Sequence, residues 1–159
     1  MILVLLGTQA NDFSRLLKEI EKQIDKGIIK EEVVVQAGST KFETSKMKIF
    51  DLLSKEEIDE LKKKASLIIT HGGVGSIVSS IKLGKKVIGV PRLQKYGEHV
   101  NDHQLEIINN FAKKGYIKGV ENLNQLGAIL QEIDDFTPEK YESNNDRMIS
   151  LIEDFIDNN

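Results

Sequence analysis

Three glycines and several hydrogen-bonding side chains lie together in the segment THGGVGS, residues 70–76, which begins at the last residue of the apolar run SLIIT. A strand, a glycine turn and a helix in this order leave unpaired N–H groups at the helix start, and these groups favour an anion. Gly72 and Gly73 would let a phosphate approach the backbone with no Cβ in the way, and Ser76 could cap the helix or add a hydroxyl donor. A tight turn without a ligand needs the same glycines, so this motif alone leaves both interpretations open.

Two common phosphate-binding motifs fit the chain badly. The dinucleotide-binding fingerprint would need a third glycine where Val78 follows Gly73 and Gly75, and it belongs to a first strand rather than a fourth. Gly84 and Lys85 do not form a P-loop, because no glycine precedes them at the required spacing and neither Ser nor Thr follows them. Neither a nicotinamide cofactor nor a P-loop nucleotide is therefore expected.

A second polar segment, PRLQKYGEHVNDHQ at residues 91–104, follows the next apolar run and holds two of the three histidines of the chain. His99 and His103 are four residues apart, with Glu98 and Asp102 nearby, which would suit a zinc site if the histidines shared a helix face. Two such histidines are also typical of a polar helix face, and the spacing fixes no third ligand. We therefore expect no metal.

Further residues of this segment suit contacts to a sugar diphosphate. The amide of Gln104 offers a donor and an acceptor to sugar hydroxyls, although an ordinary solvated residue in a first helical turn is the alternative. Arg92 and Lys95 are candidate cations for a departing diphosphate, with solvated loop charges as the alternative. Imidazole suits a general base at neutral pH, but the sequence singles out none of the histidines for that role.

The elements that must position these segments alternate between apolar runs and amphipathic stretches. Strands are predicted at residues 2–6, 32–36, 47–51, 66–70 and 86–90. Helices are predicted at residues 13–24, 54–64, 74–83 and 99–114, and from 122 or 124 to 133. This alternation predicts a Rossmann-like, doubly wound α/β fold with a mainly parallel sheet, whose ligands bind at the carboxyl ends of the strands.

Size and composition favour one domain over residues 1–159, since 159 residues with 40% hydrophobic content suffice for one core. Thr137 and Pro138 are expected to open a C-terminal helical extension, residues 137–159, that carries Met148, Leu151, Ile152 and Phe155. The chain contains no cysteine, which excludes thiol redox chemistry and thiolate metal sites and suits a cytoplasmic location.

Charge and hydropathy argue against two classes of function. The formal net charge is −3 and acidic residues lie between the lysines and arginines, so no basic stripe is available for nucleic acid. The opening run MILVLLG is too short for a signal or membrane segment and is predicted to be a buried strand. Any work at a membrane is therefore expected to go through a partner or through surface contact.

The motifs HGGVGS, GKKVIGVPR and GEHVNDHQLE, with GTQ behind the first strand, resemble the C-terminal donor-binding domain of glycosyltransferase family 28 over nearly the whole chain. Within that family the chain is most similar to the PssE-type subunits of bacterial exopolysaccharide and capsule synthesis. These are similar in turn to the soluble subunit of the eukaryotic dolichol-linked GlcNAc transferase and to the second half of MurG. The resemblance implies the donor-binding half of a GT-B fold, which grips a UDP-sugar.

The same resemblance implies a set of donor-binding residues. The phosphate-side turn comprises Gly72, Gly73, Gly75 and Ser76, and the first loop comprises Gly7, Thr8 and Gln9. The segment on the sugar side comprises His99, Asn101, His103 and Gln104. We add three neighbouring residues as candidates for binding the substrate: His71, Arg92 and Glu98. Ser79 departs from the family, because relatives carry there a glutamate that holds the ribose hydroxyls, and serine is too short for that contact.

The implied activity is that of a two-component inverting glycosyltransferase, which moves a sugar from a UDP-sugar to a lipid-linked acceptor in exopolysaccharide or capsule synthesis. No cofactor is expected besides this donor substrate. A membrane-anchored PssD-type subunit would supply the acceptor site and the general base, and would hold the chain at the inner face of the membrane. The alternative is a non-catalytic nucleotide-binding regulatory module, which would need the glycine turn but not Gln104 with its polar neighbours.

Overall fold

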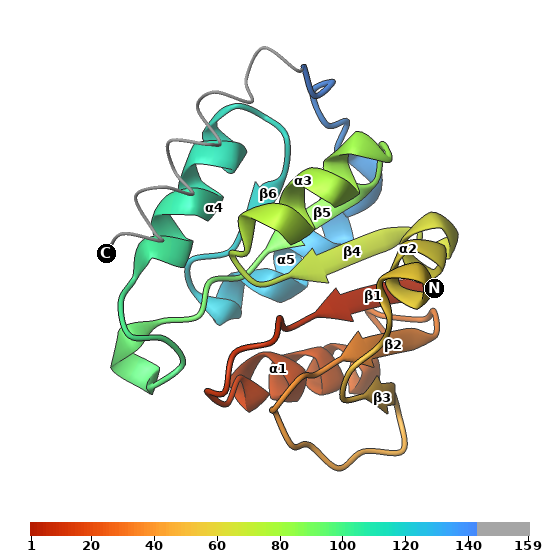
Figure 1. Ribbon diagram of the computed structural model, residues 1–159. Coiled ribbons are helices and arrows are strands. Elements are labelled where there is room, and N and C mark those ends of the chain that lie inside the picture. Colours follow the sequence, from red (N-terminus) through yellow and green to blue (C-terminus); the bar gives the residue numbers. More distant parts are fainter. Residues whose placement is uncertain (143–159) are drawn as a thin grey trace.

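In the computed structural model, which describes residues 1–142, six parallel strands form one sheet in the order β3-β2-β1-β4-β5-β6 (Figure 1). The strands are β1 (Ile2–Leu5), β2 (Val33–Gln36), β3 (Lys48–Phe50), β4 (Leu67–Thr70), β5 (Lys86–Gly89) and β6 (Lys118–Gly119). The predicted parallel, doubly wound α/β fold is confirmed, and all five predicted strands are present. The sequence does not predict β6, which is only two residues long.

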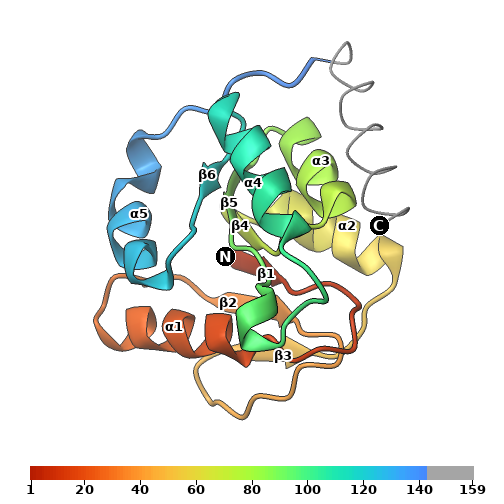
Figure 2. The same ribbon diagram turned by 90° about the vertical axis from the view of Figure 1, so that its left-hand side faces the viewer.

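Within residues 1–142, five α-helices cover the two faces of the sheet, and Figure 2 shows them on either side of the strands. One face carries α1 (Ser14–Asp25) and α5 (Leu126–Glu132), and the other carries α2 (Lys55–Lys64), α3 (Val74–Lys82) and α4 (His103–Lys113). Short 3-10 helices connect these elements at η1 (Gln94–Tyr96), η2 (Leu123–Gln125) and η3 (Ile133–Asp135).

The continuous apolar run of the first strand reflects this double cover. Val4 and Leu6 point into the layer between the sheet and α1, whereas Leu3 and Leu5 point into the layer under α3 and α4. Because both faces of the strand are buried, no alternation of apolar and polar residues remains in its sequence. The same reasoning applies to β4, of which every residue is buried.

The strand order reverses direction next to β1, and this places two loops side by side. β1 pairs with β2 on one side and with β4 on the other, and the connections then run outward in opposite directions. Leu5 and Thr70 are register partners, and the N–H of His71 donates to the carbonyl oxygen of Leu5 at 3.0 Å. The loops after β1 and β4 therefore border one crevice at the carboxyl edge of the sheet, which is where ligands bind in doubly wound folds.

The starts of α2 and α4 can be compared with the helix starts predicted from the sequence. Half of the predicted capping box of α2 is present: the Ser54 hydroxyl accepts the N–H of Glu57 at 3.1 Å, but the Glu57 carboxylate accepts from that hydroxyl instead of from the backbone N–H of Ser54. The start of α4 was predicted wrongly, because the helix begins at His103 and not at residue 99. Asn101 Oδ1 accepts the N–H of His103 at 3.0 Å, and this local bond keeps residues 97–102 outside the helix.

The C-terminal part of the chain is described only as far as residue 142. Residues 136–142 carry no helix, and they pack back on the domain through Tyr141, whose ring lies 5.7 Å from that of Tyr116. The apolar residues of the predicted helical extension lie outside the described residues, so this extension remains a prediction; they are Met148, Leu151, Ile152 and Phe155. No helix within residues 1–142 has the length and apolar character that spanning a bilayer requires.

Candidate functional site

Two adjoining cavities lie at the crevice beside β1 and β4. The histidine cavity, of about 410 Å³, is lined by Gln9, His71, Gly72, Gly73, Val74, Gly75, His99, His103, Gln104 and Ile107. The leucine cavity, of about 390 Å³, is lined by Leu5, Gly7, Thr8, Gln9, Gln36, Leu52, Leu53, Ile58, His71, Gly73, Gly75 and Ser76. Both cavities share four residues, Gln9, His71, Gly73 and Gly75. The glycine turn therefore forms a floor common to both.

Most of the residues singled out in the sequence come together here, although they come from three separate segments of the chain. The loop after β1 contributes Gly7, Thr8 and Gln9, and the turn into α3 contributes residues 71–76. The start of α4 and the loop before it contribute His99, His103 and Gln104. Ser79, Arg92, Glu98 and Asn101 line neither cavity.

The N-terminus of α3 points at this common floor. Gly73 is the N-cap residue, with φ −75° and ψ 122°, and no side chain of residues 1–142 caps the helix. The first N–H of the helix to find a partner in the preceding turn is that of Ile77, which donates to the carbonyl oxygen of Gly73 at 3.1 Å. The N–H groups of Val74, Gly75 and Ser76 therefore remain available, and together with the helix dipole they make the floor electropositive.

The glycines of the turn serve two different purposes. A Cβ on Gly72 would lie 2.4 Å from the Cβ of Gln104, and a Cβ on Gly73 would lie 2.6 Å from the Cε1 of His71. The prediction that these two glycines make room for a phosphate is therefore wrong, because protein side chains already fill that space. Gly75 differs from both, since a Cβ there would meet nothing within 4 Å and the residue faces both cavities.

His71 is a buried, neutral imidazole at the centre of the site. Its ring lies between Gly7 and Gly73, where either glycine would place a Cβ less than 3 Å from the ring, at 2.7 Å and 2.6 Å respectively. Burial, reinforced by the nearby charges of Arg92 and His99, lowers the pKa of His71 to about 4. The ring therefore carries no charge at neutral pH. Burial and the charge of Arg92 also lower the pKa of His99, which lines the same cavity.

Gln104 connects three other residues of this region through its side-chain amide. Its Oε1 accepts the N–H of Gly72 at 3.2 Å and the N–H of Arg92 at 3.0 Å, and its Nε2 lies 3.2 Å from Nδ1 of His71. The side chain is only 5% exposed. The acceptor that the sequence offers to a sugar hydroxyl is thus already occupied, and only the second Nε2 hydrogen is left for a ligand.

Arg92 was predicted wrongly as a cation for a diphosphate. The residue is 0% exposed, and its guanidinium donates to the carbonyl oxygens of Leu6 at 2.7 Å, Asn11 at 2.8 Å and Glu98 at 3.2 Å. Three backbone carbonyls and the ring of Phe13, 4.9 Å away, therefore surround the charge. Arg92 links the loop after β1 to the loop after β5 and does not reach either cavity.

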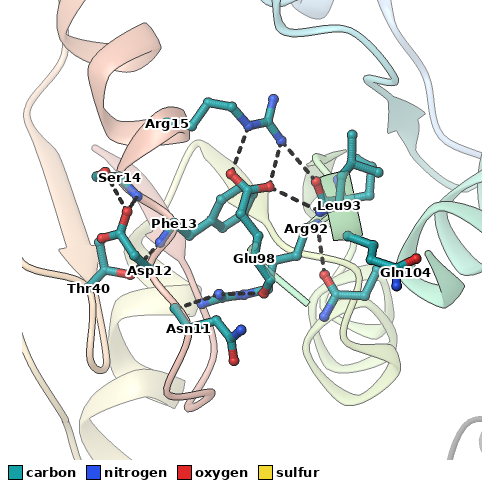
Figure 3. A network of polar contacts seen from close by, with 12 residues as sticks. Asn11, Asp12, Phe13, Ser14, Arg15, Thr40, Arg92, Leu93, Glu98 and Gln104 are labelled. Atoms are coloured by element: carbon teal, nitrogen blue, oxygen red, sulfur yellow. Dashed lines mark hydrogen bonds and ion pairs between the residues drawn. The ribbon is translucent and has the colours of Figure 1, made fainter. Parts of the chain in front are cut away.

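Glu98 belongs to the same internal network (Figure 3). Its carboxylate accepts from Nε of Arg15 at 2.8 Å, from the second guanidinium nitrogen at 2.9 Å and from the N–H of Leu93 at 3.0 Å. Glu98 is 2% exposed and has no oxygen left for a sugar, so its predicted binding role is wrong as well. The network fixes the loop that carries His99 against α1.

The remaining predicted residues lie away from the floor. Lys95 borders a third, larger groove of about 830 Å³ between α1 and the segment 121–124, on the opposite side of the loop. Asn101 uses its amide oxygen on the start of α4. Residues 1–142 contain no group of three or more His, Asp or Glu side chains that could share a metal ion. His99 and His103 do not share a helix face, since only His103 lies in α4.

Ser79, where the resemblance led us to expect a carboxylate, contacts a lysine. Its hydroxyl lies 2.6 Å from Nζ of Lys62 and donates to the carbonyl oxygen of Ser76. Lys62 is only 6% exposed, and burial lowers its pKa. At this position the chain therefore presents a hydroxyl and an ammonium group.

Several lining residues were missed from the sequence. Leu52, Leu53 and Ile58 give the leucine cavity an apolar wall, and Ile107 adds to the histidine cavity. The pair Leu52 and Leu53 directly follows the third predicted strand, so the rule that ligands bind beyond strand carboxyl ends could have found it. Gln36, the last residue of β2, follows from the same rule.

Comparisons with known proteins agree with this geometry. No curated protein matches the chain in sequence. The solution structure of ALG13 is similar with a TM-score of 0.59 at 18% identity, covering 93% of this chain and 94% of that one. The crystal structure of Acinetobacter baumannii MurG gives 0.53 at 17% identity, covering 95% and 49%. The glycosyltransferase SnogD from Streptomyces nogalater gives 0.52 at 16% identity, covering 94% and 42%.

These likenesses show the fold, which is the Rossmann-like α/β fold of GT-B glycosyltransferase C-terminal domains. The chain spans about half, 49%, of the length of the MurG chain that it matches. In sequence, residues 1–158 match the glycosyltransferase family 28 C-terminal domain. The chain therefore belongs to the glycosyltransferase family 28 C-terminal domain family.

Proposed function

We propose that this domain binds a UDP-sugar and acts as the donor-binding part of an inverting glycosyltransferase. The observation that carries the proposal is the uncapped N-terminus of α3 beneath both cavities. The N–H groups of Val74, Gly75 and Ser76 can donate to the oxygens of a diphosphate, and His71 adds an uncharged side chain beside them. No cofactor is required besides the donor.

The two cavities suit the two ends of such a donor. The leucine cavity, with Leu52, Leu53 and Ile58, offers apolar surface to the faces of a nucleobase. The histidine cavity, with His99, His103 and Gln104, offers hydrogen-bonding groups to sugar hydroxyls. The diphosphate then bridges the shared floor. In this arrangement the Ser79 hydroxyl, which stands in place of a carboxylate, donates to the carbonyl oxygen of Ser76 and accepts from Nζ of Lys62.

The reaction follows from the charge that develops at the floor. An acceptor hydroxyl oxygen attacks the anomeric carbon from the face opposite the diphosphate, a new C–O bond forms, and the bond to the diphosphate oxygen breaks with inversion. The departing oxygen gains negative charge, which the helix N–H groups stabilise without reorganisation. The proton of the acceptor hydroxyl goes to a base on the acceptor side of the cleft.

We further propose that a membrane-anchored, PssD-type subunit supplies that acceptor side, and that the acceptor is lipid-linked, as in exopolysaccharide or capsule synthesis. Large apolar side chains are exposed around this edge of the sheet, with Leu52 at 68%, Tyr96 at 53% and Val100 at 74%. Exposed apolar groups beside an open cavity suit a partner that closes over the donor and excludes water. The chain would then work at the inner face of the membrane through this partner.

Calorimetric titration with UDP, UMP, GDP and ADP tests the donor site. A diphosphate site predicts that UDP binds at least tenfold more tightly than UMP, because the β-phosphate meets the helix N–H groups. Equal affinities for UDP and UMP would contradict it. A second assay, transfer of labelled sugar to extracted lipid by the chain, by partner-containing membranes and by both together, tests catalysis. UDP binding without transfer in any combination would favour a regulatory module.

A further inference from the structure

The amide of Gln104 has only one orientation that satisfies its neighbours. Oε1 accepts two backbone N–H groups, those of Gly72 at 3.2 Å and Arg92 at 3.0 Å. If the amide were reversed, its NH₂ group would face these two donors and both buried N–H groups would lose their acceptor. Each such loss costs about 1–3 kcal/mol, so the amide nitrogen must face His71.

This orientation determines which nitrogen of His71 carries the proton. Nε2 of Gln104 is a donor and lies 3.2 Å from Nδ1 of His71, so Nδ1 must accept and carries no hydrogen. Burial, together with the nearby positive charge of Arg92, keeps the imidazole neutral at physiological pH. A neutral ring with a bare Nδ1 holds its single proton on Nε2.

The protonated nitrogen lies on the side of the ring that borders the cavities. The Cε1–Nε2 edge fits between Gly7 and Gly73, and a Cβ on either residue would lie within 2.7–2.8 Å of Nε2. His71 lines both cavities. Some polar side-chain atoms of residues 1–142 are fully buried without a hydrogen-bond partner, and Nε2 of His71 is not one of them. A ligand on the common floor can therefore reach this nitrogen.

We propose that Gln104 is a positioning residue, which fixes His71 as the neutral Nε2–H tautomer and so provides a permanent hydrogen-bond donor beside the N-terminus of α3. Use of that donor on a diphosphate rests on the proposed function, whereas the tautomer itself does not. In the opposite tautomer Nε2 would present a lone pair, which repels phosphate oxygens. Gln104 thereby influences a bound ligand through His71, although its own amide oxygen does not contact that ligand.

The test is to observe the ring nitrogens of His71 directly by ¹⁵N NMR at pH 7.5, without ligand. The wild-type chain is expected to show a protonated Nε2 and an unprotonated Nδ1. In Gln104→Glu one carboxylate oxygen still accepts the two backbone N–H groups, and the other accepts a hydrogen from Nδ1. This variant is expected to move the proton to Nδ1 and to raise the pKa of His71, with UDP affinity at pH 8 at least tenfold lower.

The matched control is Gln94→Glu, which adds the same charge on η1 at an exposed residue outside both cavities and should change neither tautomer nor affinity. A wild-type His71 protonated on Nδ1 would overturn the proposal, and no variant is needed for that result. An unchanged tautomer in folded Gln104→Glu would also overturn it. A switched tautomer with unchanged UDP affinity would support the positioning role and contradict the diphosphate site.

Discussion

Acidification should destabilise this domain through His71 in a way that can be calculated. The pKa of His71 is about 4 in the folded chain, against about 6.5 for an unperturbed imidazole in the unfolded chain. Below pH 6.5 the imidazole of His71 therefore binds a proton in the unfolded chain, whereas in the folded chain it binds one only as the pH approaches 4. The free energy of unfolding is unaffected by this group above pH 7 and falls as the pH drops from 6.5 towards 4.

The size of the effect follows from the two pKa values. Between pH 7 and pH 5 the loss amounts to roughly 2 kcal/mol, and the full loss at still lower pH is about 3 kcal/mol. Urea unfolding at pH 7, 6 and 5 measures it, with His71→Gln as the control that cannot titrate. Carboxylates titrate alike in both chains, so the difference between the two pH profiles isolates His71. Parallel profiles would refute a buried, neutral His71.

Four further substitutions separate residues that stabilise the fold from residues that contact a ligand. Gly72→Ala should unfold the domain or lower its free energy of unfolding, measured in urea, by several kcal/mol, because the new Cβ would lie 2.4 Å from the Cβ of Gln104. Gly75→Ala should raise the free energy of unfolding by up to about 1 kcal/mol, because alanine has a higher helix propensity than glycine and the new Cβ has room. Glu98→Gln should lower the free energy of unfolding by about 2–3 kcal/mol, because it removes the charge that pairs with Arg15. The same variant should leave UDP affinity within twofold, since Glu98 lines neither cavity. Ser79→Glu should leave UDP affinity nearly unchanged because Lys62 neutralises the new carboxylate, and should tighten it when combined with Lys62→Met; tightening by Ser79→Glu alone would contradict that ion pair.

The layout of the fold could be predicted because it rests on local patterns. Apolar runs such as SLIIT mark strands buried on both faces, and the alternation with amphipathic helices fixes a parallel sheet. From that layout the crevice beside β1 and β4 follows, so the glycine turn and the loop at residues 7–9 were placed correctly. The strand β6 escaped prediction because two residues at a sheet edge leave no periodic pattern.

The roles of the polar residues could not be predicted, because they depend on partners far away in the sequence. A charge in a loop is usually solvated, yet Arg92 is buried on carbonyl oxygens of Leu6 and Asn11, more than 80 positions earlier. The roles of the glycines in the turn also depend on contacts with residues distant in the sequence. Only the folded chain shows that Gly72 faces Gln104, whereas Gly75, unlike the other two glycines of the turn, has room for a Cβ among residues 1–142.

The central claim, that the start of α3 binds a diphosphate, is tested most directly by calorimetry of UDP with Gly75→Glu and Gly75→Lys. Both side chains have room and a higher helix propensity than glycine, and the helix dipole should make the glutamate variant about 0.6–2 kcal/mol more stable than the lysine variant. Binding should change in the opposite direction: Gly75→Glu should lower UDP affinity at least tenfold, and Gly75→Lys should retain or improve it. If both folded variants bind UDP as the wild-type chain does, the diphosphate does not lie on this floor.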